Sequence, residues 1–211
     1  FIMEAMWTKF LPTTIKVKQW IKEGRIGRVK HIRANFGYQA PYDAGSRLFN
    51  PDLAGGALLD VGVYPITYVV HMLDRLPDEI ISSAEFGKTN VDDQNIIIMK
   101  YKDGILADLS SSVAVELGYD AMIIGEEGKI AVPKFWSADE AYLYNQKNEL
   151  IESFKEPHHE NGYEYEAYEV NRCLRENKLE SDKLPFIDTL EVMRIMDKIR
   201  QEWGLLYPQE K

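Results

Sequence analysis

The sequence predicts an α+β domain built on one open, mostly antiparallel mixed β-sheet with helices on one face. Segments that alternate between apolar and polar residues follow one another through the middle of the chain, and segments with helical periodicity lie before and after them. The 211 residues, of which 45% are hydrophobic, suffice for one sizeable core. We therefore expect a single domain over residues 1–211.

The first predicted elements are a helix and a strand. Apolar residues recur at near-helical spacing between Pro12 and Lys22, and Gly24 follows as a helix stop. Val29–Tyr38 then alternates with a period of two, which predicts a strand with at least one buried face. The following stretch, Gln39–Gly56, is long for a plain connection, and loops of this kind are often functional.

Ala57–Leu73 predicts a second helix with an apolar surface wide enough to be mostly buried. Pro65 lies inside it and cannot donate a backbone hydrogen bond, so we expect a kink or irregular turn around Val61–Pro65. The pattern then predicts a run of strands and two closing helices. The strands are Glu79–Phe86, Gln94–Tyr101, Ile105–Val113, Tyr119–Ile124, Lys129–Val132, Ala141–Tyr144 and Leu150–Phe154, and the helices are Gly162–Asn177 and Phe186–Trp203.

The strand segment Asn95–Tyr101 carries apolar residues in both of its alternating sets, so both faces of the sheet need cover there. Helices in a chain of this length cover only one face. We expect a second copy of the protein to cover the other face, giving a homodimer. The alternative is that this face packs under the long loop.

Composition narrows the range of partners. The formal charge of -9 repels phosphate backbones and anionic lipids, which argues against nucleic-acid and membrane partners. No apolar run approaches the roughly 20 residues of a membrane span, and no signal peptide is evident, so we expect a cytoplasmic protein. Cys173 is the only cysteine and offers neither a disulfide nor a thiolate cluster. His158 and His159 are neighbours on a polar loop, where we expect no metal.

The pattern that suggests chemistry contains an acid and a phenol. Asp60 and Tyr64 are spaced i and i+4, which puts both side chains on one helix face, where they can form a proton-transfer pair. Tyrosine has a pKa of about 10, so a nearby cation is needed for work near neutral pH. From the residues alone, a buried Asp60 that bonds the helix start and a Tyr64 in the core explain the pattern equally well.

Three further residues are candidates for substrate binding. Arg47 lies in the long loop and is suited to holding oxygens of a substrate or cofactor, or is a solvated arginine. Trp7 and Phe10 are expected as an apolar wall of the pocket or as aromatic core packing. No glycine-rich phosphate loop is present, so we expect no cofactor-binding residue in this chain.

Residues Gly55–Pro65 resemble the Gly-Gly-x-Leu-Leu-Asp-x-Gly-x-(His or Tyr) signature of the Gfo/Idh/MocA oxidoreductases. The tyrosine at position 64 points to the branch with dimeric dihydrodiol dehydrogenases and sugar dehydrogenases. Met3–Pro12, Gly24–Val29 and Trp203–Pro208 resemble further segments of the same family, although Lys9 stands where arginine is common. The resemblance covers essentially the whole chain.

The resemblance implies an architecture in which a Rossmann domain for NAD or NADP precedes a domain like the C-terminal one of glyceraldehyde-3-phosphate dehydrogenase. This chain resembles only the second domain, which lines the substrate pocket and dimerises, so the N-terminal Rossmann domain is absent. Asp60 and Tyr64 fall on two catalytic positions of the family. The third is a lysine in a Glu-Lys-Pro segment of the missing domain.

The function implied by the resemblance is hydride transfer between a nicotinamide cofactor and a sugar, polyol or cyclic diol. We expect the full-length protein to be an NAD(P)-dependent dehydrogenase and the fragment alone to be inactive. The alternative is a module that keeps the fold for ligand binding or oligomerisation without catalysis.

Overall fold

A computed structural model describes residues 1–210 of the chain, which form one mixed sheet of eight strands in the order β2-β3-β4-β1-β5-β6-β7-β8. Only β1 and β4 pair in parallel, and every other neighbouring pair is antiparallel. The predicted α+β fold with a mostly antiparallel mixed sheet is confirmed. The strands are β1 (Val29–Gly37), β2 (Glu79–Phe86), β3 (Asp92–Lys100), β4 (Leu106–Ser112), β5 (Ala121–Gly125), β6 (Gly128–Val132), β7 (Glu140–Asn145) and β8 (Leu150–Lys155).

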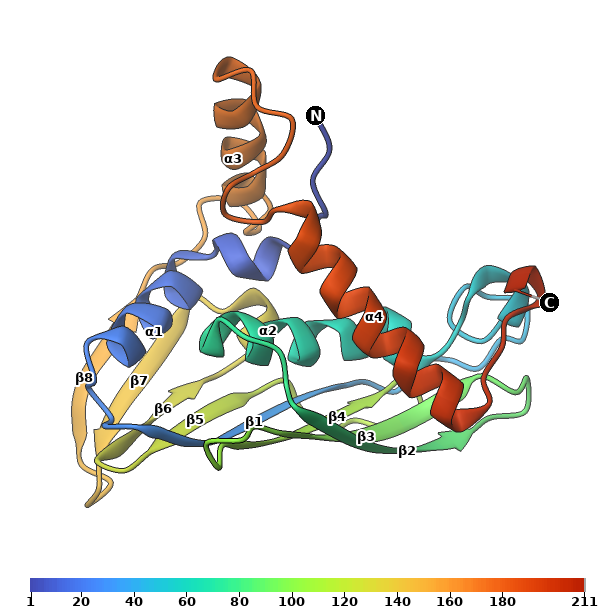
Figure 1. Cartoon of the computed structure of the whole chain (residues 1–211), viewed down its shortest axis with the longest axis horizontal. Helices are drawn as coiled ribbons and strands as arrows, with labels where there is room; N and C mark the ends of the chain where they lie inside the picture. The colour runs from blue at the N-terminus through green and yellow to red at the C-terminus, as the bar shows by residue number, and fades with distance from the viewer. Residues whose placement is uncertain (211) are drawn as a thin grey trace.

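Three helices cover one face of the sheet (Figure 1). Helix α1 (Pro12–Lys22) packs over β7 and β8, α2 (Val63–Leu73) lies over β1 and β4, and α4 (Phe186–Trp203) lies over β2. Helix α3 (Glu164–Arg175) projects away from the sheet on the same side as the N-terminus. The short 3₁₀ helix Trp7–Phe10 precedes α1 and contacts α2 and α3.

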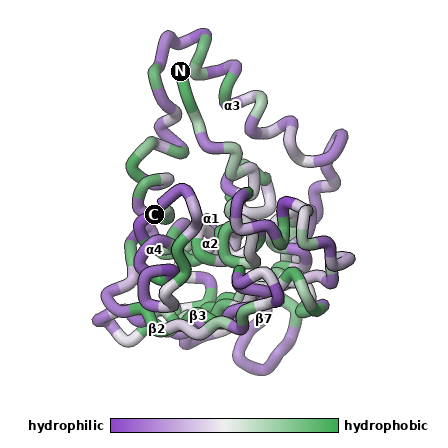
Figure 2. The backbone as a smooth tube through the Cα atoms, turned by 90° about the vertical axis from the view of Figure 1, so that its right-hand side faces the viewer, coloured by the Kyte–Doolittle hydropathy of each residue, from purple (hydrophilic) through white to green (hydrophobic). Residues whose placement is uncertain are grey.

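The core lies between the sheet and these helices, and Figure 2 shows the apolar α2 in this layer. Its largest fully buried side chains include Trp20, Tyr68, Ile97, Leu109 and Ile123. The helical run Pro51–Leu73 has the length and hydropathy of a membrane span, which corrects the expectation that no apolar run approaches that length. Because 61% of its most apolar window is buried inside the fold, we assign it to the core.

The opposite face of the sheet carries apolar side chains that no helix covers. On β3, Ile97 and Met99 point into the core, whereas Ile96 and Ile98 are 56% and 37% exposed. Ile81 and Leu106 on the flanking strands are exposed as well. The long loop therefore does not cover this face, and the packing alternative is wrong. We call this surface the open face.

The predicted helix Ala57–Leu73 consists of two elements. A π-helix, Leu58–Gly62, precedes α2, in agreement with the expectation of an irregular turn near Pro65. Pro65 has no N–H to donate to the carbonyl of Val61, which favours a wider turn before it. Gly62 permits close approach to β4, since a Cβ atom there would lie 2.9 Å from the Ser111 hydroxyl.

Candidate active site

The buried carboxylate of Asp92 holds the start of the π-helix that carries Asp60. Asp92 on β3 accepts a hydrogen bond from the backbone N–H of Leu58 at 2.8 Å and another from the Asn95 amide at 2.8 Å. Burial raises the pKa of Asp92 to about 6. Gly56 has φ 121° and lies against this carboxylate, where a Cβ atom would come within 2.2 Å of Oδ1. Asp92 therefore makes the helix-start bond that the alternative interpretation gave to Asp60.

The carboxylate of Asp60 is held by two donors. Tyr38, directly after β1, donates its hydroxyl to Oδ2 at 3.1 Å, and Arg47 donates to Oδ1 at 2.5 Å. The Asp60 side chain is only 15% exposed, whereas that of Arg47 is 67% exposed. Arg47 was predicted to hold a substrate or to be solvated, but the structure pairs its guanidinium with Asp60.

Tyr64 lies in the first turn of α2 and its ring is partly buried among aromatic side chains. Its centroid is 5.3 Å from that of Phe36 and 6.4 Å from that of Trp136. Burial raises the pKa of the Tyr64 phenol, so it is protonated at neutral pH. No hydrogen bond joins Tyr64 to Asp60 in the described residues, where both Asp60 oxygens accept from Tyr38 and Arg47 instead.

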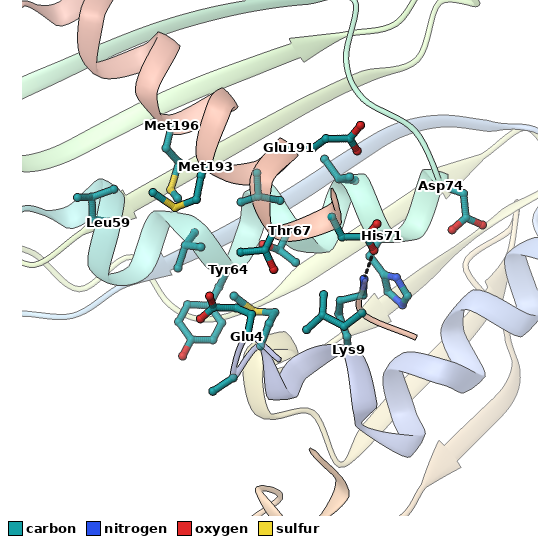
Figure 3. Close-up of a pocket in the computed structure, with 18 of the residues that line it drawn as sticks. Glu4, Lys9, Leu59, Tyr64, Thr67, His71, Asp74, Glu191, Met193 and Met196 are labelled. Atoms are coloured by element: carbon teal, nitrogen blue, oxygen red, sulfur yellow. Dashed lines mark hydrogen bonds and ion pairs between the residues drawn. The ribbon is translucent and has the colours of Figure 1, made fainter. Parts of the chain in front are cut away.

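Asp60 and Tyr64 nevertheless line the same cavity, of about 430 Å³, between α2, α4 and the segment before α1. Tyr64, Thr67 and His71 project from α2, while Met193 and Met196 approach from α4 (Figure 3). The Lys9 ammonium, almost wholly buried, pairs with Asp188 at 2.7 Å. The cavity thus joins the acid and phenol to an apolar wall and an internal ion pair.

Sequence reasoning missed His71, which lines the cavity two helical turns after Tyr64. Burial and the ammonium groups of Lys18 and Lys9 lower the pKa of His71 to about 3, so its ring is neutral at physiological pH. The Lys18 ammonium lies 3.4 Å from Nδ1 of the ring. The spacing of Tyr64, Thr67 and His71 at i, i+3 and i+7 is the sequence signal that could have indicated a shared face.

Neither aromatic candidate lines the cavity. Trp7 is 3% exposed and packs against Tyr163 and Trp136, with centroids 4.4 and 5.5 Å away. Phe10 is buried with Met6 and Leu184 in a small cluster beside the main core. Both side chains therefore pack in the core, which was the alternative interpretation, and a role of Trp7 and Phe10 in substrate binding stays a prediction.

A group of potential metal ligands lies away from the cavity, where Glu169, Cys173 and Asp182 converge within 4.8 Å. Arg172 donates to both carboxylates of this group, and Lys183 lies 3.0 Å from Glu169. These cations already balance the acids, so the group is an internal ion-pair network that ties α3 to the loop after it. His158, in the loop before α3, contacts the carbonyl of Ser137 at 3.0 Å.

The described residues do not fit the pyrophosphate of a nicotinamide dinucleotide. Such a group needs a glycine-rich turn between a parallel strand and a helix. The turn Gly125–Gly128 instead joins the antiparallel strands β5 and β6 as a hairpin. The parallel pair β1 and β4 is connected through the Gln39–Gly56 loop, α2 and two further strands.

Comparisons with known proteins agree with the fold. Trans-1,2-dihydrobenzene-1,2-diol dehydrogenase of Danio rerio is 33% identical over 217 residues, an alignment that covers 100% of this chain and 64% of that protein. D-xylose 1-dehydrogenase (NADP(+)) of Hypocrea jecorina is 30% identical over 243 residues, covering 99% of this chain and 61% of that protein. The chain therefore spans less than two thirds of the length of these relatives.

Solved structures share the fold at lower identity. A 3-ketoreductase from Actinomadura kijaniata, in complex with NADP and TDP-benzene, superposes with a TM-score of 0.82 at 20% identity, covering 95% of this chain and 62% of that one. An aldose-aldose oxidoreductase from Caulobacter crescentus gives a TM-score of 0.81 at 18% identity, covering 95% and 61%. A family profile described as the GFO/IDH/MocA C-terminal domain matches residues 14–131. The chain belongs to the GFO/IDH/MocA family, whose C-terminal domain it contains.

Proposed function

We propose that this chain is the substrate-binding half of an NAD(P)-dependent oxidoreductase that acts on a sugar, a polyol or a cyclic diol. In this proposal Tyr64 exchanges a proton with a substrate oxygen, and Asp60 supplies a fixed negative charge beside it. The observation that carries the proposal is that Asp60 and Tyr64, the two residues of the family signature, line one cavity.

The pKa of Tyr64 decides whether the phenol donates or accepts a proton when no cation is nearby. Burial raises the pKa of the phenol, so Tyr64 Oη is a proton donor toward a carbonyl oxygen at neutral pH. To take a proton from a hydroxyl, the phenol needs a cation nearby. Among residues 1–210, Lys9 is paired with Asp188 and Arg47 with Asp60, so neither is free for that task.

A cation from another part of the protein suits this cavity. Glu4 and Glu191 line it and take part in no ion pair with any other described residue. These two unpaired carboxylates give the cavity surplus negative charge, which attracts an ammonium group. The lysine of the Glu-Lys-Pro segment, which the family resemblance implies, fits this role.

The nicotinamide cofactor, whether NAD or NADP, would supply the hydride chemistry and would be bound mainly outside these residues. The relatives support the cofactor class, because the names of the xylose dehydrogenase and of the ketoreductase complex both include NADP. They also support the substrate class, since one is named for a cyclic diol and another for a sugar. Within the cavity, Leu59, Val63, Met193 and Met196 offer an apolar wall suited to a carbon ring.

The proposal includes a cytoplasmic homodimer that associates through the open face. Ile81, Ile96, Ile98 and Leu106 form an exposed apolar patch on adjacent strands there. Contiguous patches of this kind mark association surfaces in globular proteins. A second copy would cover them with the same residues by twofold symmetry.

The test compares two tyrosines of one helix in the full-length protein. Tyr64→Phe should lower kcat at least 100-fold toward dihydrodiols or aldoses, because it removes the proton donor, and should leave the affinity for the nicotinamide cofactor unchanged. Tyr68→Phe is the matched control, since this buried hydroxyl has no hydrogen-bond partner in the described residues and its loss should not change kcat. Unchanged turnover in Tyr64→Phe would sink the assigned role, and the absence of any oxidoreductase activity in the wild type would favour a binding module.

A further inference from the structure

Tyr38 is the residue that reaches Asp60 from the sheet. Its backbone continues β1, because its N–H donates to the carbonyl of Ser112 at 3.1 Å. Its ring lies against Phe36, with centroids 6.4 Å apart, and its hydroxyl donates to Asp60 Oδ2 at 3.1 Å. The phenol therefore comes from the rigid layer of the fold and not from a loop.

The two donors to Asp60 differ in how firmly they are held. Arg47 lies on the Gln39–Gly56 connection, and its side chain is 67% exposed, so solvent and salt weaken its hold on Oδ1. Tyr38 is partly buried and loses little side-chain freedom on binding, since a tyrosine has only two side-chain torsions. Burial and the charge of Asp60 raise the pKa of Tyr38 to about 12, so its hydroxyl remains a donor throughout the working pH range.

We propose that Tyr38 is a positioning residue of the active site, which fixes the carboxylate of Asp60 so that its charge faces the cavity shared with Tyr64. This inference rests on the proposed function of Asp60 and Tyr64. Tyr38 itself does not line that cavity, so it acts through Asp60 and not on the substrate. The hydrogen bond occupies Oδ2 while Arg47 occupies Oδ1, and an Asp60 held at both oxygens serves as a fixed charge, with the proton exchange left to Tyr64.

A double-mutant cycle in the full-length protein tests the inference. Tyr38→Phe should lower kcat about 10-fold while KM changes less than twofold, because a hydrogen bond to a charged group is lost and the apolar contacts of the ring are kept. In an Asp60→Asn background the same change should have no further effect, since the charge to be positioned is gone. Tyr101→Phe is the matched control, because this buried hydroxyl has no partner among the described residues.

Two outcomes would overturn the role of Tyr38 while leaving the proposed function intact. One is an unchanged kcat in Tyr38→Phe when Asp60→Asn is impaired. The other is a full 10-fold effect of Tyr38→Phe in the Asp60→Asn background, which would mean that the phenol acts on the substrate directly.

A structural measurement covers the case in which the wild type shows no turnover. In a crystal structure of Tyr38→Phe, the Asp60 carboxylate should rotate so that Oδ2 finds a new donor or solvent, with the π-helix Leu58–Gly62 unmoved. An Asp60 carboxylate in its original orientation would contradict the inference. Because this readout does not depend on catalysis, failure of the proposed function and failure of the positioning role remain distinguishable.

Discussion

The two faces of the sheet use the same kind of residue for different purposes. On β3, Ile97 lies in the core at 1% exposure, while its neighbours Ile96 and Ile98 point outward on the open face. The covered face also supports α2 and the π-helix, which carry Tyr64 and Asp60. Composition alone does not distinguish the two sets of isoleucines; only their direction from the strand does.

The proposed function places catalysis and association on opposite sides of one sheet. Asp60 and Tyr64 both line the cavity between α2, α4 and the segment before α1. The open face carries the apolar patch together with the His31–Asp108 contact between the parallel strands β1 and β4. Substitutions on one face should therefore change assembly, and substitutions on the other should change stability or turnover.

The largest expected effect is on association. Ile96→Lys with Ile98→Lys should raise the dissociation constant of the proposed dimer about 1,000-fold, because the four half-exposed isoleucines of the two copies contribute roughly 1 kcal/mol each and four unpaired charges replace them. Light scattering of the full-length protein should show a shift from two chains to one. Leu179→Lys is the control, since this residue is 77% exposed but lies outside the sheet. A wild type that is already monomeric would contradict the assignment of the open face.

The next largest effect is on stability and concerns the core-facing isoleucine of the same strand. Ile97→Ala should lower the free energy of unfolding by about 3 kcal/mol, because it removes buried methyl groups and leaves a cavity between β3 and the helices. Denaturant titration in the Ile96→Lys, Ile98→Lys background separates this loss from any change in assembly. A loss below about 1 kcal/mol would mean that the core collapses around the site or that Ile97 is less well packed than its burial indicates.

Much of this architecture is readable from sequence because it is local. The predicted bounds of α1, β2 and α4 agree with the structure at both ends, since periodicity and stop signals define them within a few residues. The irregular turn near Pro65 was predicted too, but the π-helix begins earlier, at Leu58. Its start depends on Asp92, a residue 34 positions further along the chain, and no local pattern reveals that bond.

In the candidate site, too, the sequence predicted local features and not long-range contacts. Asp60 and Tyr64 could be predicted because they stand in one short signature. Tyr38, by contrast, reaches Asp60 from a different strand, and the Lys9–Asp188 pair joins residues 179 positions apart. For Arg47 the sequence indicated a functional loop but not its partner. For Trp7 and Phe10 the sequence left two interpretations open, because an aromatic side chain near a site looks the same in sequence whether it lines a cavity or fills the core.

The smallest expected effect is on the pH dependence of stability and concerns His71, on the covered side of the sheet. The pKa of His71 is lowered to about 3 in the fold from its usual 6.5, so the unfolded chain takes up the proton first as the pH falls. Stability is therefore fully present above pH 6.5 and declines between pH 6.5 and 3, by at most about 1.4 kcal/mol per pH unit. His71→Gln should remove this part of the acid sensitivity in denaturant titrations at pH 7, 6 and 5, while the exposed His159→Gln should not. Parallel stability profiles for the wild type and His71→Gln would contradict the lowered pKa, because they would mean that folding leaves the proton affinity of the ring unchanged.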